Sequence, residues 1–197
     1  MRARRVHADR LDFEGIDKED AISVRAAIDR GEVFAGYIPE TALDFIVRNF
    51  QTLAKLGVLE ESWLAAYVHS SNLAAHGLSI VNAVFDACDR NRLLELKPLG
   101  EQVNRSRGDR LTLFRGCAGP IHTMGMSWTP SLDKAIWYAA HHAEYHGLTN
   151  RAVYVATVQI AEIYCRLDHY DDDFIVRPLT VWRVDVPDNE FRLDRPR

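Results

Sequence analysis

The second half of the chain contains a guanidinium, hydroxyls and carboxylates that could act together on one ligand. Arg115 lies in the stretch LFRG and is followed by Gly116, which has no Cβ to keep backbone or ligand away from the guanidinium. A planar guanidinium held at the end of a strand suits bidentate capture of a diphosphate or carboxylate. We therefore expect an anion-binding arginine at the end of a strand over 111 to 114. Considered alone, Arg115 is better explained by a structural salt bridge.

The hydroxyls lie in the next stretch, MSWTPSLDKAIWYA. Ser127 and Thr129 belong to a predicted strand over 125 to 129. A helix is expected to follow from Pro130 to about His146, with Thr129 as its N-terminal cap. Considered alone, Ser127 is better explained as an edge-strand hydroxyl.

The same stretch carries three aromatic side chains, Trp128, Trp137 and Tyr138. Their rings could stack on an adenine or nicotinamide base. Because Trp137 and Tyr138 are adjacent on the predicted helix, at most one of them can face a site, and the other is expected to pack on the sheet.

The carboxylates occur in the stretch YDDDFIVRP, where three aspartates precede a predicted strand over 174 to 176. Considered alone, Asp171 to Asp173 are best explained as a solvated acidic turn. A fragment of a calcium-binding loop is a second explanation, but the regular spacing of oxygen ligands in an EF-hand loop is missing.

The order and spacing of these three stretches resemble the ADP-ribosyltransferases of the arginine, serine, glutamate type, which include bacterial toxins and phage-encoded enzymes. In that family a strand-end arginine, often followed by glycine, holds NAD. A Ser-X-Thr or Ser-X-Ser strand leads into a helix with an aromatic-aromatic-Ala pattern, and an acidic-X-Glu turn opens a strand that soon meets a proline. The resemblance covers the C-terminal half of the chain only.

The resemblance implies that NAD is the substrate and that its binding site can be assigned by position. Arg115 would bind the NAD phosphates or the adjacent ribose. Ser127 would hold the nicotinamide ribose and orient the acidic residue, and Thr129 would support the strand. The full set of residues expected to contact NAD comprises Arg115, Gly116, Ser127, Trp128, Thr129 and Tyr138.

The catalytic residues implied by the resemblance are Asp173, Asp171 and Ser127. Asp173 would stabilise the transition state, and Asp171 would orient or deprotonate the acceptor. Breaking the bond between nicotinamide and ribose passes through an oxocarbenium-like cation, as glycoside cleavage does, and a fixed carboxylate stabilises that charge.

This sequence departs from the family at both acidic positions, where glutamate is usual. The carboxylate of Asp173 lies about 1.5 Å further back because aspartate is one methylene shorter. A misplacement of that size can lower a rate by about a hundredfold. Three functions therefore stay open: transfer of ADP-ribose to a macromolecule, hydrolysis of NAD, and a catalytically silent module that binds NAD or a protein.

The composition of the 197 residues, with 47% hydrophobic and 26% charged residues, is that of a globular protein rather than of a disordered or membrane protein. The net charge of −4 gives no overall field that would attract nucleic acid or anionic lipid. Arg2, Arg4 and Arg5 are not followed by a long apolar run, so we expect a cytoplasmic protein without a membrane partner. The three cysteines form no CxxC pair and are expected to be reduced. Cys117 follows the Arg-Gly pair, but no base is evident for it, so a buried thiol is expected.

The expected partners are NAD and an unidentified protein acceptor. A nucleic-acid acceptor stays open, although no basic stripe supports extended binding. No metal site is expected: His142 and His146 share a helical face at i and i+4, but the HExxH arrangement is missing and Glu144 lies on another face.

Hydrophobic periodicity predicts an α+β protein. A helical N-terminal subdomain (1 to 100) is expected to pack on a mixed, mostly antiparallel split β-sheet (111 to 197) that contains an NAD cleft, with 101 to 110 as linker. Helices are predicted over 17 to 30, from Pro39 to 56, 60 to 76 and 79 to 96. Strands are predicted over 111 to 114, 125 to 129, 152 to 160, 163 to 166, 174 to 176 and 180 to 186.

Overall fold

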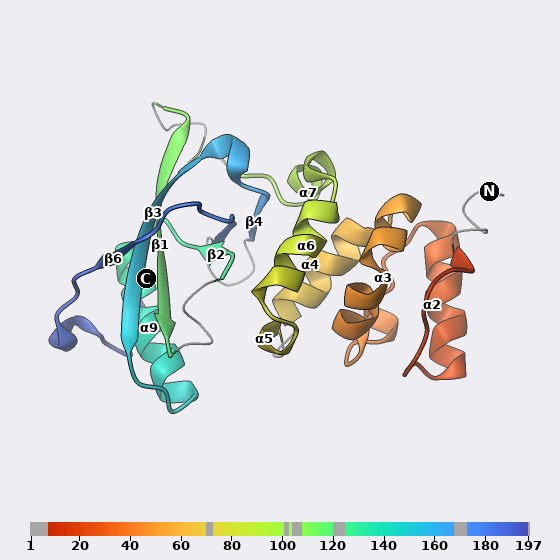
Figure 1. Ribbon diagram of the computed structural model, residues 1–197, viewed down its shortest axis with the longest axis horizontal. Helices are drawn as coiled ribbons and strands as arrows, with labels where there is room; N and C mark the ends of the chain where they lie inside the picture. The colour runs from red at the N-terminus through yellow and green to blue at the C-terminus, as the bar shows by residue number, and fades with distance from the viewer. Residues whose placement is uncertain are drawn as a thin grey trace. The chain divides into compact units, whose positions relative to one another are not determined.

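The computed structural model has an α+β fold, with a helical N-terminal region followed by two antiparallel three-stranded sheets (Figure 1). It describes residues 8–69, 73–100, 103, 108–119, 125–167 and 173–196. The chain divides into two compact units, Met1–Leu96 and Lys97–Arg197. The predicted α+β class is therefore confirmed.

The first unit is built from six α-helices among its described residues. They are α2 (Lys18–Arg30), α3 (Ala42–Leu56), α4 (Leu59–His69), α5 (Leu73–His76), α6 (Leu78–Ala87) and α7 (Arg90–Leu96), with a 3₁₀ turn, η1 (Ala35–Tyr37), before α3. Gly31 and Gly57 follow α2 and α3 in the left-handed conformation, with φ of 76° and 67°, which glycine adopts without steric cost. The ends of these two helices are thus where the sequence places them.

Aromatic rings fill the core of the helical unit. The rings of Phe34 and Phe45 meet edge to face at 5.4 Å, and those of Trp63 and Phe85 do so at the same separation. All four side chains are fully buried. These aromatic side chains on α3, α4 and α6 therefore pack in the core.

Two predicted helices differ in the structure. Pro39 lies outside α3, because η1 and a turn precede the helix, which begins at Ala42. The helix predicted over 79 to 96 is divided at Cys88, whose backbone is extended (φ −70°, ψ 145°). Asp89 then uses its Oδ1 to accept the N–H of Asn91 at 2.8 Å at the start of α7. The apolar spacing continues across this break, so periodicity alone could not reveal it.

The second unit contains six strands and one α-helix among its described residues (Figure 1). They are β1 (Arg110–Ala118), β2 (Ser127–Trp128), α9 (Leu132–Tyr145), β3 (Arg151–Gln159), β4 (Cys165–Leu167), β5 (Asp173–Ile175) and β6 (Trp182–Val184). The strand orders are β1-β3-β6 and β2-β5-β4, and each described pairing is antiparallel. The predicted strand over 180 to 186 is thus shorter. Most of the predicted linker lies outside the described residues, and Arg110 already belongs to β1.

Among the described residues, one β-bridge, between Phe114 and Thr129, joins the two sheets. The N–H of each residue donates to the carbonyl of the other, at 2.7 Å and 2.8 Å. Beyond this bridge, toward Arg115 and Ser127, the described residues of β1 and β2 are not paired. The sheets therefore part on the side where the predicted site residues lie.

The two faces of β1 have different neighbours. Phe114 and the buried Val153 pack with Ala135 and Ala139 of α9. A Cβ on Gly116 would lie 1.7 Å from the carbonyl oxygen of Ala135, so glycine is needed there for the close approach of α9. Of the two neighbours that Gly116 was expected to admit, backbone or ligand, the structure shows backbone, because α9 occupies that space.

No helix in the described ranges is long and apolar enough to cross a bilayer.

Candidate functional site

Arg115 lies inside β1 rather than at its end. It pairs with Tyr154 of β3, and the next three residues pair with 151 to 153. The predicted strand end at 114 is wrong because Cys117 and Ala118, both fully buried, continue the strand. The residues before and after Arg115 on β1 are therefore both paired with β3.

The side chain of Arg115 reaches across the opening between the two sheets. Its Nη1 donates to the carbonyl oxygen of Ser127 at 2.8 Å. The guanidinium also lies against Gly125, where a Cβ would be 2.3 Å from Nη2. Its Nε is buried and has no hydrogen-bond partner among the described residues. Arg115 is thus fixed at the site and keeps donors that no described residue uses.

Ser127 and Asp173 lie on one face of the second sheet. Ser127 pairs with Ile175 of β5, and Asp173 is two residues before Ile175 on the same strand. Residues two apart on a strand point to the same face, so the side chains of Ser127 and Asp173 are diagonal neighbours, about 7–8 Å apart. Both are half-buried. A group the size of a ribose can span the two.

Asp171, the other predicted acidic residue, lies outside the described residues. Asp173 itself begins β5 and pairs with Leu167 of β4, so its backbone position is set by the sheet.

The side chains of Trp128 and Thr129 are buried, at 1% and 2% exposure. Trp128 packs with Phe174 in the core, and its Nε1 donates to the carbonyl of Gly125 at 3.0 Å. The prediction that its ring stacks on a bound base is wrong, because neither ring face is accessible. Thr129 holds the bridge to Phe114 and so supports the strand, but its side chain does not line an open site.

The cap of α9 is Ser131, not Thr129. The hydroxyl of Ser131 accepts the N–H of Lys134 at 3.2 Å, and the helix begins at Leu132. The hydroxyl of Thr129 instead accepts the N–H of Ser131 at 3.3 Å. The predicted cap is thus two residues early, because Thr129 is still engaged in the bridge.

Tyr138 and Trp137 lie on α9, which covers the β1 face opposite to Arg115. The Nε1 of Trp137 donates to the carbonyl of Leu193 at 2.8 Å, and Arg195 lies 5.4 Å above its ring. Tyr138 is half-buried and stacks on His142. The structure therefore does not bring the predicted base-stacking residue Tyr138 together with Arg115.

The two buried thiols are poor nucleophiles. Burial raises the pKa of Cys117, although Arg115 and Arg183 act in the opposite direction. Burial also raises the pKa of Cys165 to about 12. Both side chains therefore stay protonated near neutral pH, as expected of buried thiols.

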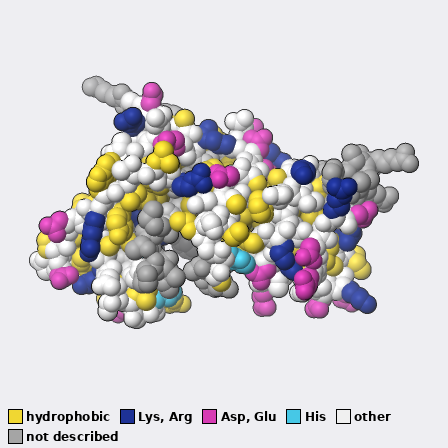
Figure 2. Space-filling view, in the orientation of Figure 1, with side chains coloured by type: hydrophobic (Ala, Val, Ile, Leu, Met, Phe, Trp, Pro, Cys, Tyr) yellow, Lys and Arg dark blue, Asp and Glu magenta, His cyan; other side chains and the backbone are white. Residues whose placement is uncertain are grey.

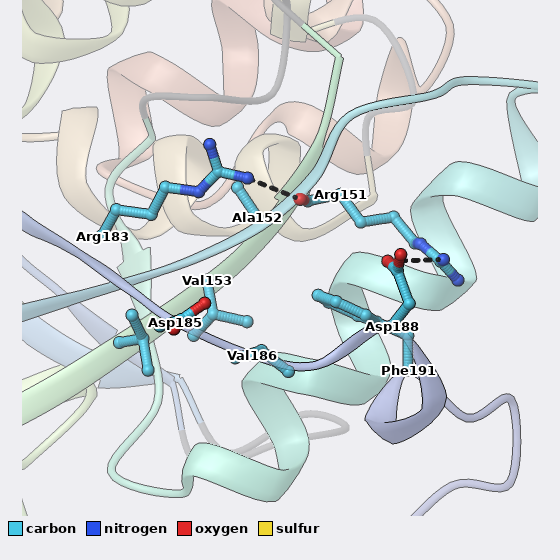
Figure 3. Close-up of a pocket in the computed structure, with 9 residues that line it drawn as sticks. Arg151, Ala152, Val153, Arg183, Asp185, Val186, Asp188 and Phe191 are labelled. Atoms are coloured by element: carbon cyan, nitrogen blue, oxygen red, sulfur yellow. Dashed lines mark hydrogen bonds and ion pairs between the residues drawn. The ribbon is translucent and has the colours of Figure 1, made fainter.

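A pocket of about 370 Å³ lies between β3, β6 and the C-terminal segment (Figure 3). Arg151 on its wall is 3.4 Å from Asp188 and stacks over the ring of Phe191 at 4.7 Å. Arg183 also lines this pocket, whereas Arg115, Ser127 and Asp173 do not. Arg183 was not predicted as a site residue, because no motif marks β6 and only the pairing of β6 with β3 shows which face Arg183 lies on.

Charged side chains of both signs are interspersed over the face drawn in Figure 2. Within the described ranges, no three His, Cys, Asp or Glu side chains are grouped so that they could hold a metal ion.

The chain matches no protein-family model, no curated protein and no solved structure.

Proposed function

We propose that this chain is an NAD-dependent mono-ADP-ribosyltransferase that transfers ADP-ribose to a protein. One observation carries the proposal. The guanidinium of Arg115 is bonded to the carbonyl of Ser127, and the strand of Ser127 pairs with the strand that Asp173 begins. Arg115 and Ser127 thus meet where the two sheets part, and Asp173 lies on the strand next to Ser127. This arrangement supports the split sheet that the family resemblance implies.

The chemistry assigned to these residues follows from their charges. Arg115 would offset the negative charge of the NAD diphosphate. As the glycosidic bond breaks, its electron pair leaves with nicotinamide and positive charge develops on the ribose. The Asp173 carboxylate would stabilise that charge, and Ser127 would bind a ribose hydroxyl. The acceptor then attacks the anomeric carbon and loses a proton, for which Asp171 is the proposed base.

The aspartate at position 173 favours one alternative, a module that binds NAD without turning it over. The backbone of Asp173 is held by its pairing with Leu167 of β4, so it has little freedom to make up for the shorter side chain. In the proposed enzyme, the substrate must instead lie closer to β5.

The test is release of nicotinamide from NAD by the full chain, with and without a cell lysate. We expect release that increases with lysate, together with a protein product heavier by one ADP-ribose. Asp173→Asn keeps the shape but removes the charge, and should lower release by about a hundredfold or more. Proteinase and nuclease digestion of the product distinguish a protein from a nucleic-acid acceptor.

Other results of this experiment would support a different function. Release that is independent of lysate would identify an NAD hydrolase. If only Asp173→Glu releases nicotinamide and the native protein binds NAD without release, the silent module is correct. Absence of both NAD binding by calorimetry and nicotinamide release would overturn the proposal.

A further inference from the structure

The pairing of the first sheet places Arg115, Tyr154 and Arg183 in one row. Arg115 pairs with Tyr154, and Tyr154 pairs with Arg183 on the other side. Directly paired residues of antiparallel strands project from the same face. Neighbouring strands are about 4.8 Å apart, so the Cα atoms of the two arginines are about 10 Å apart across the tyrosine. We call these three residues the arginine row.

The arginine row lies on the face of the sheet that α9 does not cover. Leu113, two residues before Arg115, packs with Trp128 and Ala156 in the core on that face. Phe114 and Gly116, which alternate with Leu113 and Arg115 along β1, lie on the opposite face and contact α9. The row therefore belongs to the same side of β1 as the opening toward Ser127.

The two guanidiniums lie over this face in different places. Arg115 is directed toward β2 through its bond to Ser127. Arg183 reaches from β6 to β3, where its Nη2 lies 3.4 Å from the carbonyl oxygen of Arg151 (Figure 3). Burial raises the pKa of Cys117, both guanidiniums lower it, and this thiol lies two residues after Arg115 on β1. The two positive charges thus lie on one face of the sheet, on either side of Tyr154.

Neither guanidinium is neutralised within the described part of the chain. No described carboxylate lies within 4.0 Å of Arg115 or Arg183, whereas the neighbouring Arg151 is paired with Asp188. The bond from Arg183 to Arg151 is near the upper limit of hydrogen-bond length and is readily exchanged for a better acceptor. Two guanidiniums on one face of a sheet, neither with a described carboxylate beside it, suit a ligand with more than one anionic oxygen.

We infer that Arg183 is a second cation of the proposed NAD site, and that the arginine row binds the two phosphates of a nucleoside diphosphate group. Arg115 holds the phosphate nearer to Ser127, and Arg183 holds the phosphate on the adenosine side, with Tyr154 beneath them. The identity of the ligand rests on the proposed function, whereas the charge and placement of Arg183 are independent of it.

The test measures binding of ADP, pyrophosphate and adenosine to the full chain by calorimetry. We expect Arg183→Gln to weaken ADP and pyrophosphate about tenfold or more, because it removes charged hydrogen bonds. Arg183→Lys keeps the charge and should lose less. Adenosine lacks phosphate, so its affinity should not change.

Arg110→Gln is the matched control. Arg110 is exposed and lies on β1, but its position in the strand alternation puts it on the opposite face from Arg115. Its replacement should leave ADP binding unchanged. Thermal unfolding of each variant checks that the fold is intact.

The inference is overturned if Arg183→Gln binds ADP like the native protein, if Arg110→Gln weakens ADP as much, or if ADP does not bind. These outcomes are separate from failure of the proposed function. ADP binding that depends on Arg183 in a protein that does not cleave NAD would support the arginine row and reject the transferase.

Discussion

Two polar side chains, Asn49 in the helical unit and Arg115 in the sheet unit, are bonded to the protein in different ways. In the helical unit, Asn49 is 4% exposed and is saturated: its Oδ1 accepts the N–H of Asp12, and its Nδ2 donates to the carbonyls of Asp12 and Phe45. In the sheet unit, Arg115 makes one such bond among the described residues and retains a buried Nε without a partner. A saturated group ties chain segments together, whereas one with spare donors is suited to a ligand.

The largest effect on stability is expected from Gly116→Ala. The new Cβ would overlap the backbone of α9 at Ala135, and neither element can move without disturbing the core. We expect a loss of about 3 kcal/mol in the free energy of unfolding, measured by denaturant titration. Gly108→Ala is the control, because a Cβ there meets nothing within 4 Å. Equal stabilities of the two variants would contradict the close packing of α9 on β1.

Asn49→Ala tests whether the fully hydrogen-bonded Asn49 stabilises the fold. It leaves backbone groups of Asp12 without their partner, so the free energy of unfolding should fall by about 2 kcal/mol. Asn91→Ala, at an exposed helical position, should change it by less than about 0.5 kcal/mol. Thermal and denaturant unfolding both report the difference. If Asn91→Ala lowers the free energy of unfolding as much as Asn49→Ala does, the hydrogen bonds of Asn49 are not what stabilises the fold.

Arg115→Gln tests whether Arg115 serves ligand binding rather than stability. Only one hydrogen bond to a described residue is lost, so the free energy of unfolding should change by about 1 kcal/mol. NAD affinity, measured by calorimetry, should fall by at least about tenfold, because a charged contact to phosphate disappears. If stability falls more than at Asn49 while NAD binding is unchanged, Arg115 is a structural residue.

A smaller effect concerns the Cys165 thiol, whose pKa is raised from 9.0 to about 12 by burial. The folded state keeps the proton while the unfolded state loses it, so stability is full below pH 9 and declines as the pH rises toward 12. One pH unit above 9.0 corresponds to about 1 kcal/mol. Cys165→Ala should therefore lose about that much less stability between pH 8 and pH 10. Parallel pH profiles for the two proteins would refute this.

Sequence alone predicted the elements with local signals. Gly31 and Gly57 mark helix ends through their own conformational freedom, and the α+β class follows from the change in hydrophobic period. The break at Cys88 was missed because a polar cap at Asp89, rather than a loss of apolar spacing, divides α6 from α7.

The candidate site was predictable only where the motif and the strand alternation agree. If Ser127 faces the opening, Trp128 must point the other way into the core, so alternation could have excluded Trp128. Gly116 was assigned to the ligand, but Gly125 is the glycine that lies against Arg115, and only the fold brings them together. Arg183 depends on a long-range pairing with β3 that no local pattern specifies.

The bridge between Phe114 and Thr129 makes the coupling of the two sheets measurable. Its two amide hydrogens exchange with solvent only when the bridge opens, so their exchange rates measure how often the sheets separate there. A ligand held by Arg115 on one sheet and by Ser127 on the other would stabilise the closed bridge and slow both rates together. Amide exchange at these two positions thus reports ligand binding before any bond in the ligand is broken.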